Sequence, residues 1–399
     1  MSKSISSDIL DNRVSRIIAV QTALVLSKNA LVSSSIYILK YNNLLNILIL
    51  SILVMIYLMF FIKNIRAIKF SIVSFLLVFF IAISILLSFF RYDVFQYSYF
   101  VDDFQDFLLY SLPILFIIPI IKDMSILIKW FYKSSYYIFF FVILSAFIFL
   151  FSRDVGYASE YSMSFGKTAI VPTIFFISKW FKDHKMIDLL IVLILLVTII
   201  VFASRFPILI IGVFLVIKFV FGSGKERWLK IFIIIFFGLI ILMFLKDIAI
   251  NFNNFLSLFD IDSRTLRYII NNNLTYDSGR ELIHSSLTGY INNKPVFGYG
   301  IGSSYVLLDN GLAHGFYYDV ISSFGYVFGF LFLFIFSIIT IISFIKTSSR
   351  YTKELILIFG VRFLPIITIQ GSLLASAEFW IIIAITIQVL ARVKFRVMK

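Results

Sequence analysis

Residues 186–221 read MIDLLIVLILLVTIIVFASRFPILIIGVFLVIKFVF. Two apolar runs, 186–203 and 206–221, are separated only by a short turn that holds Arg205. A lipid bilayer needs about 20 apolar residues per helix, with a range of roughly 17–25. Backbone groups inside lipid must be satisfied within the protein, so such runs form helices. This stretch therefore predicts a helical hairpin in a membrane.

The whole chain has the same apolar character. Of its 399 residues, 61% are hydrophobic and only 14% are charged, against about 45–50% and about 25% in soluble domains. This composition excludes an ordinary soluble enzyme and a disordered protein. The chain contains no cysteine, which excludes disulfides, thiolate metal sites and a cysteine nucleophile.

The hydropathy pattern predicts about twelve membrane-spanning helices. They lie near 17–39, 44–62, 68–90, 107–121, 131–151, 167–182, 186–203, 206–221, 229–249, 317–345, 354–370 and 373–391. The expected fold class is therefore an all-α, multi-pass integral membrane protein.

The positive charges indicate how these helices are oriented. Lysine and arginine concentrate in every second connection and in the tail, at 63–69, 122–133, 179–185, 218–230, 346–353 and 392–399. Cytoplasmic connections carry an excess of these residues, so both termini are predicted to be cytoplasmic. The net charge of +14 is thus a topology signal, and we expect no nucleic-acid partner.

One connection differs from the others in length. Residues 250–316 form a polar segment that the topology places outside the cytoplasm, and loops longer than about 12–15 residues are uncommon unless they are functional. The chain is therefore expected to divide into nine spans (1–249), a large outer loop (250–316), and three spans with a basic tail (317–399).

The outer loop contains a predicted helix with candidate site residues. Ser278 and Glu281 have the spacing of a capping box, and the helix is expected to end near 292–293, before Pro295. Arg280 and His284 share one face of this helix. Upstream, two further arginines are one turn apart on a short predicted helix, Arg264 and Arg267.

A glycine-rich segment follows the predicted helix. Residues 295–302 read PVFGYGIG, but no strand precedes them, as a phosphate-binding glycine loop would require. We therefore interpret Gly298 and Gly300 as parts of a tight turn that lets backbone approach backbone. His314 and Tyr317 come next, at the start of the tenth span, where Gly325 and Gly329 are expected to form a close-packing face within one helix.

These motifs together resemble those of a known family. Gly279-Arg280, the segment 295–300, Ala313-His314 and Gly325 are similar, in this order, to the O-antigen polymerase and ligase superfamily (the Wzy and WaaL proteins). The resemblance covers roughly residues 278–330, and the predicted span layout extends it. Gly315 replaces the asparagine that often follows the histidine, and the fuller histidine signature of ligases is absent, which favours a polymerase.

The resemblance implies a membrane glycosyltransferase with a GT-C-like fold in the bacterial inner membrane, with its active site facing the periplasm. Its donor would be an oligosaccharide on undecaprenyl diphosphate, and its acceptor a second lipid-linked repeat unit. A ligase would instead transfer the glycan to lipid A–core. A chain-length regulator is an expected partner on the same basis, besides membrane lipid.

The resemblance also implies roles for three residues, Arg205, Arg280 and His314. The two arginines would hold the donor diphosphate, for which guanidinium groups are suited because they donate in a bidentate fashion and stay charged. Pro207 is suited to the first turn of a helix, whose positive end would favour an anion beside Arg205. The histidine would deprotonate or orient the acceptor hydroxyl. No metal or soluble cofactor is expected.

Several alternatives remain open. Arg264 and Arg267 are candidates for the diphosphate clamp in place of Arg205, and His284 is a candidate to line the same pocket. Gly298, Gly300 and Tyr317 complete the candidate substrate-binding set. A lipid-linked oligosaccharide flippase or another transporter also fits twelve spans, although no internal repeat is evident.

Charged residues elsewhere allow two interpretations each. Asp102, Asp103 and Asp106 form an outward acidic cluster, which we interpret as solvated, with a catalytic carboxylate as the alternative. Arg362 and Glu378 lie within predicted spans, where charges are costly and need partners. They are expected to pair with each other or to line a polar channel.

Overall fold

The computed structural model describes residues 2–39, 71–151, 163–202, 205–221, 244–258, 263–271, 280–368 and 371–397, together with the single positions 51, 52, 55, 59 and 232. The chain divides into two compact units. Unit 1 contains 1–18, 53–128 and 277–399, and unit 2 contains 19–52 and 129–276. The expected outer loop, 250–316, is therefore shared between the two units.

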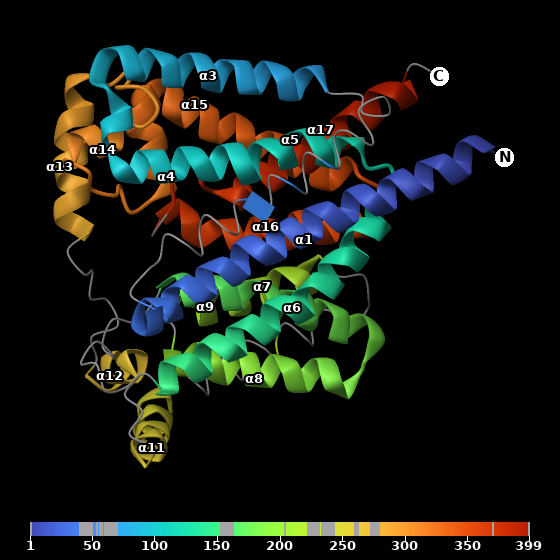
Figure 1. The fold of residues 1–399 in the computed structure, drawn as a ribbon, viewed down its shortest axis with the longest axis vertical. Helices are drawn as coiled ribbons and strands as arrows, with labels where there is room; N and C mark the ends of the chain where they lie inside the picture. The colour runs from blue at the N-terminus through green and yellow to red at the C-terminus, as the bar shows by residue number, and fades with distance from the viewer. Residues whose placement is uncertain are drawn as a thin grey trace. The chain divides into compact units, whose positions relative to one another are not determined.

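The regular elements of the described residues are all helices (Figure 1). They are α1 (Ser2–Leu39), α3 (Ile72–Tyr92), η1 (Val94–Gln96), α4 (Ser98–Asp106), η2 (Phe107–Ser111), α5 (Leu112–Ile117), η3 (Ile118–Ile120), α6 (Met124–Phe151), α7 (Met163–Asp183), α8 (Met186–Phe202), α9 (Arg205–Val220), α11 (Leu245–Ser257), α12 (Arg264–Ile270), α13 (Arg280–Asn293), α14 (Ser303–Leu307), α15 (Phe316–Lys346), α16 (Arg350–Thr368) and α17 (Ala377–Val397).

The described helices have the character of a helical membrane protein. Four are long and apolar enough to cross a bilayer: Ile72–Tyr92, Ser98–Ile120, Met124–Ile148 and Phe316–Lys346. Met186–Val201 and Pro207–Val220 are shorter apolar helices. Most of the predicted span at 44–62 and most of the one at 229–249 lie outside the described residues. The number of twelve spans and their orientation stay predictions.

The helix α15 is broken at Gly325, where the sequence predicted one continuous helix. Gly325 has φ 74° and ψ 174°, which is not a helical conformation. A Cβ added at Gly329 would lie 3.2 Å from the Cα of Ile321, although eight residues of straight helix span about 12 Å. The two halves of α15 therefore meet at a sharp bend. Gly325 and Gly329 do not form a packing face on one straight helix.

The core of unit 1 is aromatic and contains a buried ion pair. The rings of Phe363 and Phe316 both pack against Phe379 in α17. Beside them the guanidinium of Arg362 in α16 lies 2.6 Å from the carboxylate of Glu378, and both side chains are buried. Of the two interpretations of these charges, the structure supports their pairing with each other.

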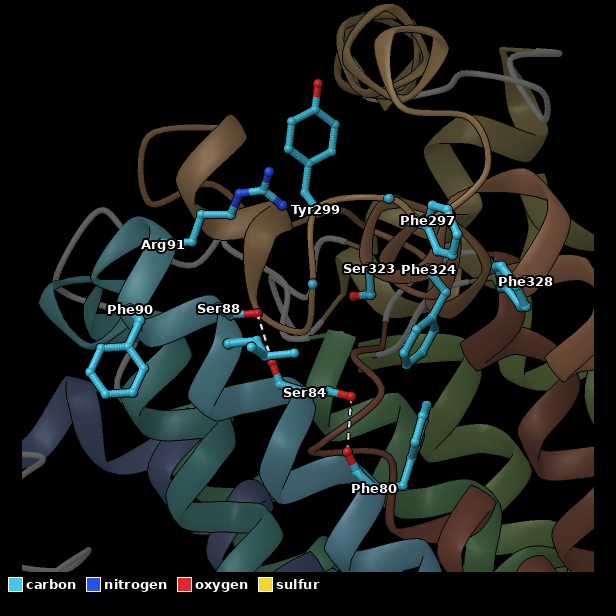
Figure 2. A pocket seen from close by; sticks show the side chains of 13 residues that line it. Phe80, Ser84, Ser88, Phe90, Arg91, Phe297, Tyr299, Ser323, Phe324 and Phe328 are labelled. Carbon is cyan, nitrogen blue, oxygen red and sulfur yellow. Dashed lines mark hydrogen bonds between the residues drawn. The ribbon is translucent and has the colours of Figure 1, made fainter.

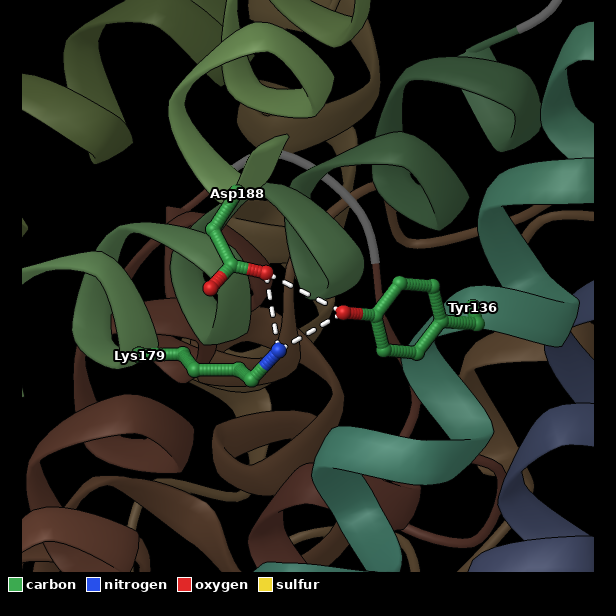
Figure 3. A network of polar contacts seen from close by, with 3 residues as sticks. All are labelled: Tyr136, Lys179 and Asp188. Atoms are coloured by element: carbon green, nitrogen blue, oxygen red, sulfur yellow. Dashed lines mark hydrogen bonds and ion pairs between the residues drawn. The ribbon is translucent and has the colours of Figure 1, made fainter. Parts of the chain in front are cut away.

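Unit 2 has a polar cluster between α6, α7 and α8 (Figure 3). The ammonium group of Lys179 donates to the carboxylate of Asp188 at 2.8 Å and to the hydroxyl of Tyr136 at 2.6 Å. The same hydroxyl donates to Asp188 at 3.1 Å. Two of these contacts reach Oδ1 of the buried carboxylate and compensate its charge, as an apolar interior requires.

Candidate functional site

The segment 295–302 closes onto the break in α15. The amide N–H groups of Tyr299 and Gly300 donate to the carbonyls of Ser322 and Ser323, each at 2.8 Å. These carbonyls belong to the last turn of the first half-helix, where helical partners are missing. In return, the N–H of Val327 donates to the carbonyl of Pro295 at 3.3 Å. The segment therefore caps both sides of the break.

Glycine is required where the two backbones meet. Gly298 has φ 63°, and a Cβ there would lie 2.3 Å from the backbone nitrogen of Gly325. A Cβ on Gly325 would in turn lie 2.6 Å from the carbonyl of Val296. These contacts confirm the prediction of a tight turn that brings backbone against backbone.

The same turn also contacts the neighbouring helix α3. A Cβ on Gly300 would lie 2.2 Å from the hydroxyl oxygen of Ser88, so this serine rests against the glycine backbone. The turn, α3 and α15 together line an open pocket of about 740 Å³ (Figure 2). Its lining includes the apolar side chains of Phe80, Leu87, Phe90, Phe297, Phe324 and Phe328 and the polar side chains of Ser84, Ser88, Arg91 and Ser323.

The face of α13 packs against the start of α15. Leu287 and Ile291 form a buried cluster with Ala313 and Ile321, so α13 and α14 lie at the same end of α15 (Figure 1). Ala313 is the immediate neighbour of His314. The helix that begins with Arg280 is thereby fixed against the segment that carries the predicted catalytic histidine.

Two histidines belong to this region. The imidazole of His284 stacks on the ring of Tyr318, with centroids 3.9 Å apart and planes 14° apart. Its Nε2 is buried and has no hydrogen-bond partner among the described residues. His314 is half-buried and has φ 49°, a left-handed conformation that histidine adopts more often than most residues. Tyr317 is half-buried and packs against the cluster around Ala313.

Buried polar groups connect α14 to α4 and to the segment before α17. The hydroxyl of Tyr305 donates to the carboxylate of Asp103, which also has a side-chain hydrogen bond with Ser372. Burial raises the pKa of Tyr305 well above its usual value, so this phenol remains a neutral donor. Asp103 is therefore part of an internal network, and its interpretation as a solvated carboxylate was wrong.

A second carboxylate in this network was missed from the sequence. The buried Asp319 accepts from the hydroxyl of Ser304 at 2.7 Å and from the N–H of Leu373 at 2.8 Å. It lies in the first turn of α15, a favourable position for an anion. A single aspartate at the start of a long apolar run was the only signal in the sequence that could have found it.

The remaining predicted site residues lie in unit 2. Arg205 begins α9, and Arg264 begins α12. The hydroxyl of Ser263 donates to the carbonyl of Ile200 at 3.0 Å, so the start of α12 rests on the last turn of α8, directly before the connection to Arg205. Arg267 is exposed on α12.

The structure thus groups the predicted residues into two sets. Unit 1 contains Arg280, His284, Gly298, Gly300, His314 and Tyr317, and unit 2 contains Arg205, Arg264 and Arg267. The predicted cap at Ser278 lies outside the described residues. No group of three or more acidic, histidine or cysteine residues that could hold a metal is found in the described part of the chain.

The sequence was compared with protein families and with curated proteins, and neither comparison gives a match.

Proposed function

We propose that the chain is a membrane glycosyltransferase that polymerises a surface polysaccharide from repeat units carried on a lipid diphosphate. The family resemblance of the motifs gives the donor and acceptor classes. The support from the fold is a helical membrane protein with four helices long and apolar enough to span a bilayer.

One observation carries the proposal furthest. Motif segments that are separate in the sequence meet in unit 1, because the turn 295–302 caps the break in α15 and α13 packs beside His314. Arg280, the glycine turn and His314 therefore belong to one structured region. A buried cluster of Leu287, Ile291, Ala313 and Ile321 joins the elements that carry these motifs, which supports a common site more than a random set of loop residues would.

The proposed chemistry is a single displacement. The acceptor hydroxyl oxygen attacks the anomeric carbon of the donor sugar and gives its proton to His314. The bond between that carbon and the diphosphate oxygen breaks, and the lipid diphosphate leaves with the electron pair. Arg280 stabilises the negative charge that develops on this leaving group, an effect worth about 2.7–4 kcal/mol when such a donor is lost. The role of Arg205, which belongs to unit 2, stays a prediction from the family resemblance.

The test is polymer formation by variants in a host that lacks its own copy of the gene. His314→Asn should abolish polymer, because asparagine tolerates the left-handed backbone but cannot accept the proton. His184→Asn is the matched control, since this exposed histidine has φ 52° and no proposed role. Normal polymer from a His314→Asn protein that reaches the membrane would contradict the proposal.

A second matched pair tests the diphosphate clamp. Arg280→Gln should reduce polymer by about 10²-fold or more, whereas Arg350→Gln should leave it unchanged. Arg350 is exposed at the start of α16 and lies outside the proposed site. Equal polymer from the two variants at equal protein amounts would remove Arg280 from the mechanism.

A further inference from the structure

Helix α11 is too short and too polar to cross a bilayer. Its 13 residues extend about 20 Å at the rise of an α-helix, whereas the hydrocarbon core is about 30 Å thick. Phe244, directly before it, has φ −100° and ψ 10°, which lies outside the helical range, so α11 begins anew at Leu245. Five of its residues are charged or carry amides: Lys246, Asp247, Asn251, Asn253 and Asn254. The helix therefore does not span the membrane by itself.

One side of α11 packs onto its own unit. Ala249 and Leu256 are buried in a cluster with Leu266 of α12 and Val201 of α8. The helix α12 in turn packs against α8. All three helices belong to unit 2, so the place of α11 relative to the end of α8 is defined.

A second apolar side of α11 faces outward. Phe244, Ile248, Phe255 and Leu258 follow one another at spacings of four, seven and three residues, which places them on one side of a helix. Each is at least half exposed, and Leu258 is 78% exposed. We call these four residues the α11 stripe. Asn251 lies on the same side, so the stripe has one amide at its centre.

The helix α8 indicates what covers the α11 stripe. Leu190, Leu193 and Val197 form an exposed apolar side of α8, as expected of a helix that faces lipid. Val201 lies one turn beyond Val197 on the same side, where the cluster with α11 and α12 covers it. The pair α11–α12 therefore lies against the lipid-facing side of α8, at the end of that helix. The ends of spanning helices lie at the boundary between hydrocarbon and headgroups.

The direction of α11 also suits this boundary. Figure 1 shows α11 running across the direction of α8, next to α12. Amphipathic helices that lie in the plane of the membrane bury their apolar side about 5–10 Å deep and keep their polar side in water. The side of α11 opposite the stripe is polar and consists of Lys246, Asn253 and Ser257. Both sides of α11 thus match the two media that meet at the membrane surface.

We propose that α11 is an interfacial anchor, and that the α11 stripe inserts into the lipid leaflet in which α8 ends. The partner is the lipid surface itself. The four apolar side chains enter the region between headgroups and acyl chains, and Asn251 remains near the headgroups. Because α12 is attached to α11, the anchor keeps α12 at the depth of the headgroups. The proposal depends neither on the glycan reaction nor on the side of the membrane that this leaflet faces.

Spin labels on the full-length chain in liposomes test the depth of α11, because the chain contains no cysteine of its own. Two pairs of single-cysteine variants are compared, Phe255→Cys with Ser257→Cys and Ile248→Cys with Lys246→Cys. The positions in each pair are two residues apart and so lie on opposite sides of α11. The measured quantity is the ratio of oxygen to nickel-chelate accessibility, which is high in lipid and low in water. We expect this ratio to be about threefold or more higher for the label on the stripe than for its control.

Two further labels calibrate the depth. Val197→Cys on α8 should give the ratio of the hydrocarbon core, and Asn292→Cys at the end of α13 should give that of water, since both residues are exposed. The labels at Phe255 and Ile248 should lie between these two values, because an interfacial helix is buried less deeply than a span. A ratio equal to that at Asn292 would contradict the anchor.

Three other outcomes would also overturn the proposal. Equal ratios within both pairs would show that α11 has no lipid-facing side. Low accessibility to both reagents on the stripe, with spectral broadening that disappears on dilution with unlabelled chain, would show that a second copy covers it. Low accessibility without broadening would show that another part of the chain covers it. None of these results bears on polymer formation, so the anchor and the proposed function can fail separately.

Discussion

At the scale of single residues, the buried ion pair between Arg362 and Glu378 has the largest expected effect on stability. Arg362→Met leaves a buried carboxylate without its cation, which should lower the free energy of unfolding by about 3–5 kcal/mol. The double variant Arg362→Met with Glu378→Leu should regain most of this loss, since no charge is then left buried. Denaturant unfolding in micelles measures both, and a double variant as unstable as the single one would contradict a purely structural pair.

The phenol of Tyr305 gives a second prediction at this scale. Burial raises its pKa in the folded protein well above the usual value. The contribution of this phenol to the free energy of unfolding is therefore full below about pH 10, the pKa of tyrosine in the unfolded chain. It decreases as the pH rises above that value. Tyr305→Phe should lose about 1–3 kcal/mol near neutral pH and show a weaker decline above pH 10. The exposed Tyr99 supplies the control, as Tyr99→Phe should match the native profile.

Residue roles were only partly predictable from the sequence. Charges inside apolar runs are conspicuous, so Arg362 and Glu378 could be identified as needing partners before the fold was known. Asp103 was misinterpreted because its partner Tyr305 lies 202 positions away. No local pattern reveals a hydrogen bond of that sequence separation.

At the scale of elements, the glycine turn and the break in α15 form one unit. Gly298→Ala should lower the free energy of unfolding by about 2 kcal/mol or more, because a left-handed backbone disfavours a Cβ and the added atom would overlap Gly325. Gly289→Ala in α13 is the matched control, since no atom lies within 4 Å of its added Cβ. It should be neutral or slightly stabilising. Similar unfolding curves for the two variants would refute the close contact.

The sequence predicted the turn but not the break. The motif PVFGYGIG signals a turn through its proline and glycines. Residues 317–345, in contrast, form one apolar run, and glycine within a membrane helix is common enough that Gly325 alone indicated only close packing. The break depends on the turn that supplies its hydrogen bonds, and that partner is set by tertiary structure.

At the scale of the whole molecule, the absence of cysteine makes the predicted topology easy to test. Asn292 lies exposed at the end of α13, and Ser348 lies exposed beyond the other end of α15. In intact spheroplasts, Asn292→Cys should react with a membrane-impermeant maleimide, whereas Ser348→Cys should react only after permeabilisation. The reverse pattern would invert the orientation inferred from lysine and arginine.

Composition and hydropathy predicted the helical membrane character well, because both follow from the demands of lipid on every residue. The division of the outer loop between two units could not be predicted. Residues 250–276, which include α12, belong to unit 2 with α8, through contacts such as that between Ser263 and Ile200. Such contacts join segments that no local periodicity connects.

The most direct test of the central claim is the surface glycan of a host that lacks this gene, resolved as a ladder on a gel. If the chain is a polymerase, this host should still make core that carries a single repeat unit, because ligation continues without polymerisation. Returning the native gene should restore the ladder. Core without any repeat unit, or an unchanged ladder, would contradict polymerisation as the function of this chain.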